Sequence, residues 1–93
     1  MNNFTNISIN KSSKVSKKAL IKNNVVIGKN TIVNSFSSIG PNVHIGDNCY
    51  IGPNSIVTKG VTIGEGSIVG ANSFVSSDVE PGSRVAGNPA RKI

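Results

Sequence analysis

The chain has 93 residues, with 10 lysines and arginines against four acidic residues and a formal net charge of +6. This length allows one domain, and no stretch is long and apolar enough to span a membrane. The first ten residues lack the basic start and apolar run of a signal peptide, so we expect a cytoplasmic protein without a membrane partner.

Residues 1–8 precede a repeat and are expected to form an N-terminal cap or a disordered segment. From residue 9 onward, every sixth residue is Ile or Val, twelve times in succession: Ile9, Val15, Ile21, Ile27, Val33, Ile39, Ile45, Ile51, Val57, Ile63, Val69 and Val75. A strand repeats every two residues and a helix every 3.6, so neither explains this spacing. A period of six predicts a chain that turns a corner after each short strand, which is a parallel β-helix built from hexapeptides.

Three further positions of the hexapeptide support this interpretation. The position four residues after each aliphatic residue holds a small side chain, such as Thr31 or Ser55, which indicates a second inward site with little room. The position three residues after it is Asn, Gly or Asp in nine hexapeptides, and these residues best tolerate positive φ, so we expect the corner there. The position directly after it is glycine six times, as tight packing at the bend would favour: Gly28, Gly40, Gly46, Gly52, Gly64 and Gly70.

If three hexapeptides make one triangular turn, the twelve form four coils, and residues eighteen apart stack about 4.8 Å from each other. The sixth residue of each hexapeptide then points outward on one of three faces. We name these the Tyr50 face (Lys14, Ile32, Tyr50, Ile68), the Ile56 face (Leu20, Ser38, Ile56, Phe74) and the His44 face (Val26, His44, Thr62, Glu80).

The Tyr50 and Ile56 faces are apolar, and contiguous exposed apolar side chains usually mark an interface. We therefore expect a homo-oligomer that buries these two faces and leaves the His44 face for solvent or a ligand. The alternative is that the apolar side chains cover each other or lie under the N-terminal segment.

Pro81 interrupts the aliphatic positions, and a second proline follows at Pro89. Because proline cannot donate to a ladder of hydrogen bonds, we expect the β-helix to comprise residues 9–80. Residues 81–93 would then form a C-terminal cap or a swapped tail.

Six lysines precede Asp47, the first acidic residue, and make the N-terminal third basic: Lys11, Lys14, Lys17, Lys18, Lys22 and Lys29. These lysines either protect an exposed end of the β-helix or attract phosphate or another polyanion. Nucleic acid is not expected as a partner, because the chain has only four aromatic residues and none alternates with the lysines. Cys49, the single cysteine, falls in the small inward position, which favours an inert buried thiol over a nucleophile.

The segment from Ile45 to the end resembles the closing coils of bacterial sugar O- and N-acetyltransferases. The similarity lies in the "GVTIG" step, the "VGANSFV" coil and the terminal "VAGNPA". The chain thus resembles the hexapeptide-repeat acyltransferases. This resemblance implies an all-β, left-handed parallel β-helix of about four triangular coils with a short C-terminal tail. It also implies a homotrimer that takes acetyl-CoA as co-substrate in a groove between subunits, and a sugar or sugar nucleotide as acceptor.

The resemblance also suggests which residues contact the cofactor. Ala71, Asn72 and Ser73 fall where the family's penultimate coil lines the groove, and Arg91 and Lys92 follow the "GNPA" signature, where basic residues meet the cofactor's phosphates. The alternatives are that the first three are ordinary corner and core residues and that the last two are solvated charges.

In the family a histidine commonly acts as general base. One branch carries it in a hexapeptide that aligns with residues 21–28, where this chain has Asn23, and another carries it on an insertion that this chain lacks. His44 is the one histidine present and is therefore the candidate catalytic base, with a plain surface role as the alternative. No metal site is expected, because a zinc site on this fold needs three histidines.

Together, these features favour a coenzyme A-dependent acyltransferase that acts on a hydroxyl or amine of a sugar or sugar nucleotide. The alternative is a catalytically silent or truncated hexapeptide solenoid that serves as an assembly module.

Overall fold

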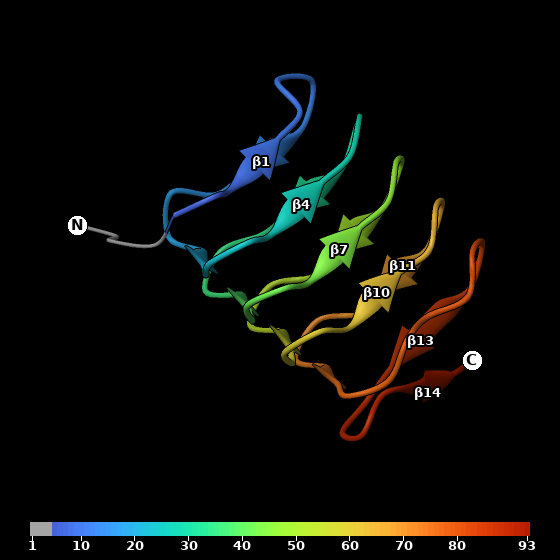
Figure 1. Cartoon of the computed structure of the whole chain (residues 1–93). Coiled ribbons are helices and arrows are strands. Elements are labelled where there is room, and N and C mark those ends of the chain that lie inside the picture. The colour runs from blue at the N-terminus through green and yellow to red at the C-terminus, as the bar shows by residue number, and fades with distance from the viewer. Residues whose placement is uncertain (1–4) are drawn as a thin grey trace.

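The structure, a computed structural model, describes residues 5–93 and forms a parallel β-helix of about four coils (Figure 1). The described residues form fourteen short strands and no helix. Accordingly, this part of the chain contains no helix that could cross a membrane. The predicted fold class, an all-β left-handed parallel β-helix, is confirmed. Residues 1–4 of the expected N-terminal cap lie outside the described residues.

The strands form three sheets, one for each face. The sheet of the His44 face contains β1 (Ser8–Ile9), β4 (Val26–Ile27), β7 (His44–Ile45) and β10 (Thr62–Ile63). The sheet of the Ile56 face contains β3 (Leu20–Ile21), β6 (Ser38–Ile39), β9 (Ile56–Val57) and β12 (Phe74–Val75). The sheet of the Tyr50 face contains β2 (Lys14–Val15), β5 (Ile32–Val33), β8 (Tyr50–Ile51), β11 (Ile68–Val69), β13 (Arg84–Ala86) and β14 (Arg91–Lys92).

The register within each sheet follows the predicted step of eighteen residues. Tyr50 pairs with Ile32 on one side and with Ile68 on the other, in parallel. His44 likewise lies between Val26 and Thr62. The outward residues therefore sort onto the three faces as expected from the sequence, up to β12.

The aliphatic residue of each hexapeptide points inward and forms the core. From Ile21 to Val75 these side chains are at most 5% exposed. Ile9 is 39% exposed because it lies in β1, the end strand of its sheet. The outward residue next to each buried one is exposed or half-buried, so the alternation of a short strand is kept in every hexapeptide.

The corners lie where the sequence places them. Nine of the twelve corner positions have positive φ: Asn24, Asn30, Phe36, Asn42, Asn48, Asn54, Gly60, Gly66 and Asn72. Glycine directly after the aliphatic residue serves a different purpose, because a side chain there would meet the next coil. A Cβ on Gly52 would lie 2.6 Å from the backbone nitrogen of Ala71. At Gly52 the approach of the next coil therefore leaves no room for a side chain.

The small inward position carries hydroxyl groups that bridge neighbouring coils. Thr31 Oγ1 donates to the Gly46 carbonyl oxygen at 2.8 Å and accepts the N–H of Cys49 at 3.1 Å. Ser55 makes the same pair of bonds to the Gly70 carbonyl and the Ser73 N–H. Within residues 5–93, every buried side-chain nitrogen and oxygen has a hydrogen-bond partner. The small polar residues thus satisfy corner backbone groups that the strands leave free.

The last coil departs from the predicted register. We expected Glu80 to follow Thr62 on the His44 face, but Val79 pairs with Ile63, sixteen residues away. The Val79 N–H donates to the Thr62 carbonyl at 2.9 Å, which Pro81 could not do in its place. Shortening the coil by two residues thus puts a valine inside, where the strict period would put Pro81.

Residues beyond Glu80 continue on the Tyr50 face. Strand β13 pairs in parallel with β11, and β14 folds back antiparallel onto β13, close to the C-terminus in Figure 1. Backbone bonds from Ala90 to Phe74 and from Phe74 to Gly87 fix this hairpin. The division of the chain at residues 8 and 80 stays a prediction.

Neighbouring valines offer a test of the inward and outward assignment. Val25 is 0% exposed and Val26 is 36% exposed. We expect Val25→Ala to lower the free energy of unfolding by about 2 kcal/mol, because it removes two buried methyl groups and leaves a cavity. Val26→Ala should cost less than about 1 kcal/mol. Urea unfolding followed by circular dichroism measures both, and equal losses would contradict the assignment.

Candidate functional site

Two of the three edges of the prism matter for the site. We call the edge between the Tyr50 and Ile56 faces the Asn72 edge; it contains residues 16–19, 34–37, 52–55 and 70–73. We call the edge between the Ile56 and His44 faces the Gly60 edge; it contains residues 58–61. In a three-sided prism the Asn72 edge lies opposite the His44 face.

The three predicted groove residues lie at the last corner of the Asn72 edge. Ala71 and Asn72 are exposed, and Asn72 has φ 60°. Ser73 is 2% exposed, and its hydroxyl donates to the Gly70 carbonyl oxygen at 2.6 Å and accepts the Gly87 N–H at 3.3 Å. Ala71 and Asn72 thus offer a surface to a ligand, whereas Ser73 ties this corner to the C-terminal hairpin.

Arg91 and Lys92 lie on β14 of this hairpin, and their side chains differ in what they contact. Lys92 Nζ lies 2.9 Å from Glu80 Oε1, the one salt bridge among residues 5–93. The hydrogen bond and the charge of Lys92 hold the pKa of the exposed Glu80 carboxyl below its usual value. In this same part of the chain Arg91 makes no ion pair, so it is the freer of the two cations for an anionic ligand.

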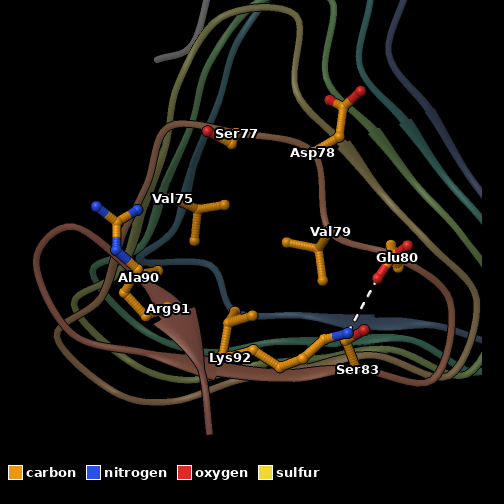
Figure 2. A pocket seen from close by; sticks show the side chains of 10 residues that line it. Val75, Ser77, Asp78, Val79, Glu80, Ser83, Ala90, Arg91 and Lys92 are labelled. Carbon is orange, nitrogen blue, oxygen red and sulfur yellow. Dashed lines mark hydrogen bonds and ion pairs between the residues drawn. The ribbon is translucent and has the colours of Figure 1, made fainter.

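A pocket of about 260 Å³ opens at the C-terminal end of the last coil. Figure 2 shows Val75 and Val79 pointing into it, while Lys92 extends along its rim to Glu80. Arg91 lies on the opposite side from Glu80 in this view. The pocket is thus the apolar interior of the final coil, bounded by charged side chains of the hairpin.

The structure brings Ala71, Asn72, Ser73 and the hairpin together but separates them from His44. His44 is exposed on β7, between Val26 and Thr62, on the face opposite the Asn72 edge. Within one copy, His44 and Ala71 therefore cannot contact the same small ligand. If they act together, they do so across a boundary between two copies.

In this geometry, the prediction that both apolar faces are buried conflicts with the prediction that His44 and Ala71 serve one groove. If a threefold assembly buried both the Tyr50 and the Ile56 face, the Asn72 edge between them would lie at the central axis. His44 would then point away from the assembly. A groove shared by His44 and Ala71 instead requires the His44 face of one copy to lie against the Asn72 edge of the next.

Sequence reasoning missed one group on the Asn72 edge. Lys18 Nζ lies 5.5 Å from the centre of the Phe36 ring. We expected no aromatic residue to accompany the lysines, since none is adjacent to them in the chain. Lys18 and Phe36 are eighteen residues apart, so the stacking of coils would have shown this contact. The pairing of Glu80 with Lys92, twelve residues apart, has no such signal because the repeat has ended.

Comparisons with known proteins support the fold and the class. The family described as bacterial transferase hexapeptide (six repeats) matches residues 42–77. No protein of curated function matches the sequence. Among 155 matching chains of solved structures are a hexapeptide-repeat acetyltransferase of Vibrio cholerae, a maltose O-acetyltransferase of Clostridium difficile and a serine acetyltransferase of Neisseria gonorrhoeae.

The Vibrio protein is 27% identical with a TM-score of 0.89, and the match covers 95% of this chain and 61% of that one. It was also solved with acetyl coenzyme A. The Clostridium protein is 25% identical with a TM-score of 0.63, with 92% and 67% covered. The Neisseria protein, at 23% identity and TM-score 0.73 with 95% and 42% covered, shows the fold alone. Residues 42–77 therefore match the hexapeptide repeat of bacterial transferases, and the chain has the fold of the hexapeptide-repeat acetyltransferases.

Cys49 occupies the small inward position of its hexapeptide, where Thr31 and Ser55 carry hydroxyl groups in other hexapeptides. It is 2% exposed, and its thiol contacts the Gly64 carbonyl oxygen at 3.2 Å. Burial raises the pKa of this thiol above its ordinary value, so folding favours the protonated form. Stability from this effect is present below the unfolded pKa and is lost as the pH rises through the folded one.

We expect Cys49 to resist alkylation by iodoacetamide at pH 8 until the chain unfolds. The rate in the native state should be at least about 100-fold lower than in urea, because the thiolate is the reactive form and the site must open first. A Cys49→Ser, Ser77→Cys double variant places the thiol at an exposed position and is the matched control. Fast native labelling of Cys49, comparable with that control, would contradict the buried position.

Proposed function

We propose that the chain forms the coenzyme A-dependent acyltransferase part of a homotrimer and transfers an acetyl group to a hydroxyl or amine of a sugar or sugar nucleotide. The observation that supports it is the match to the Vibrio acetyltransferase, which extends over 95% of this chain. The chain spans 61% of that relative, so the activity of the whole protein is part of the proposal.

The proposed cofactor groove follows the Asn72 edge. Ala71 leaves room for a ligand at the exposed corner, and the Arg91 guanidinium, which makes no ion pair within residues 5–93, suits a phosphate. Ser73 holds the hairpin beside this corner through its bond from Gly87, so that Arg91 and Asn72 flank one surface. Lys92 is partly neutralised by Glu80 and adds less to the positive potential. These residues fit an extended anionic co-substrate such as acetyl-CoA, which supplies the activated acetyl group as a thioester.

In the proposed site His44 of a neighbouring copy acts as general base. Its imidazole is exposed and takes the proton from the acceptor hydroxyl or amine as that group attacks the acetyl carbon. The imidazolium then returns the proton to the leaving sulfur. The flanking Thr62 and Val26 hold the strand but offer no second base.

The assembly that fits this site buries one apolar face against the neighbour and places the His44 face toward the groove. In a single copy, the outward residues Ile32, Tyr50 and Ile68 are each about 40% exposed, so the Tyr50 face offers a continuous apolar surface. A cyclic trimer pairs different surfaces of neighbouring copies, and this is the arrangement that a groove between His44 and the Asn72 edge needs.

His44→Ala should lower kcat for acetyl transfer by about 100-fold or more, the usual contribution of a general base. Because His44 is exposed, the melting temperature and the oligomeric mass should not change. Thr62→Ala on the same face is the matched control and should retain activity. Thiol release from acetyl-CoA with a panel of sugar acceptors measures turnover. Retained turnover in His44→Ala would reject this role, and calorimetry without acetyl-CoA binding would favour the silent solenoid.

A further inference from the structure

Phe36 is an unusual corner residue. It has φ 64°, and 62% of its side chain is exposed. Every other corner with positive φ between Asn24 and Asn72 is Asn or Gly, and a bulky side chain in this conformation is strained. Folding alone would favour asparagine at this position. Strain combined with an exposed aromatic ring is more typical of a functional site than of a structural corner.

The surroundings of Phe36 are positively charged. Lys18 Nζ lies 5.5 Å from the ring centre, and Lys17 beside it is exposed. The two corners are joined by the Phe36 N–H bond to the Lys18 carbonyl at 3.2 Å and by a 2.9 Å bond between the hydroxyls of Ser16 and Ser35. We call Lys17, Lys18 and Phe36 the Phe36 patch.

No carboxylate balances this charge along the described part of the Asn72 edge. Its corner residues are, in stacking order, Lys17 and Lys18, Ser35 and Phe36, Pro53 and Asn54, and Ala71 and Asn72. The first acidic residue, Asp47, lies on a different edge, where it accepts the Lys29 N–H at 2.7 Å. The patch therefore presents an aromatic surface and two uncompensated cations to the same ligand.

We propose that the Phe36 patch binds a nucleoside diphosphate group, with the base stacked on Phe36 and the phosphates held by Lys17 and Lys18. Aromatic rings stack with bases, and lysines bind phosphates as point charges. This inference rests on the proposed function, because coenzyme A and a sugar nucleotide acceptor both carry such a group. Phe36 lies two coils from Asn72 on the same edge, about 10 Å along the axis, so the patch and the proposed groove form one continuous surface.

A second copy of the chain is the competing occupant of this surface. With the Asn72 edge at a threefold axis, Lys17 and Lys18 of all three copies would meet within a Debye length of about 8–10 Å and repel one another. An anionic ligand instead neutralises these charges. The charge pattern thus favours a nucleotide at the Phe36 patch.

The test compares Phe36→Asn with the wild-type chain by calorimetry, using coenzyme A, uridine diphosphate and inorganic pyrophosphate as probes. Asparagine is the usual corner residue, so this variant should melt at the same temperature or higher. It should bind at least one nucleotide about tenfold more weakly or worse, and pyrophosphate equally well, because only the stacking surface is lost. If Phe36→Asn weakens the binding of coenzyme A alone, the nucleoside diphosphate group at the patch belongs to the cofactor. If it weakens the binding of uridine diphosphate alone, the group belongs to the acceptor.

The lysines are tested by Lys17→Ala/Lys18→Ala, which should weaken all three probes. Lys59→Ala, at a corner of the Gly60 edge, is the matched control and should leave them unchanged. Unchanged nucleotide binding in Phe36→Asn would overturn the proposal, as would a changed oligomeric mass with binding intact. If Phe36→Asn binds nucleotides as the wild type does and also retains acetyl transfer, the proposal for the Phe36 patch is wrong and the proposed function stands. If the wild type binds uridine diphosphate through Phe36 but never coenzyme A, the patch stands and the acyltransferase proposal fails.

Discussion

The structure depends on the corner after each two-residue strand, and at nine of the twelve corners one residue turns the chain in the left-handed conformation. Asn or Gly at this position accepts the positive φ, and glycine in the position after the aliphatic residue lets the next coil approach. Three such corners return the chain to the same face after eighteen residues, and every parallel pair up to β12 follows from that return. The faces, the core and the edges on which functional residues stand are consequences of this one constraint.

Most of the fold could be predicted from the sequence because each hexapeptide is under the same steric demands. Ile45 and Ile51 are fully buried and Tyr50 is exposed, as their positions in the repeat required. The predicted register was wrong in the last coil, where Pro81 takes the place of the inward aliphatic residue. Pro81 cannot supply the hydrogen bond that Val79 donates to Thr62, so the last coil closes two residues early and Glu80 leaves the expected register. The composition of the sequence does not show by how many residues the register shifts.

The candidate site was less accessible to sequence reasoning, because its residues come from different parts of the repeat. Motif similarity selected Ala71, Asn72 and Ser73, but the bond from Gly87 to the Ser73 hydroxyl and the pairing of Lys92 with Glu80 depend on the hairpin. His44 could be placed on a face from the repeat, yet its position opposite the Asn72 edge is apparent only when three faces are considered together. That arrangement makes two copies necessary for a site that uses both groups.

The most direct test of this account mixes two inactive variants, His44→Ala and Ala71→Trp, by unfolding and refolding them together at equal concentration. Each variant alone lacks one half of every groove. If the site lies between copies, about one quarter of all grooves in the randomly reassembled trimers combine an intact His44 with an intact edge, and acetyl transfer should return to about that fraction of wild type. A mixture that stays as inactive as its parents, although mixed trimers have formed, would contradict the account.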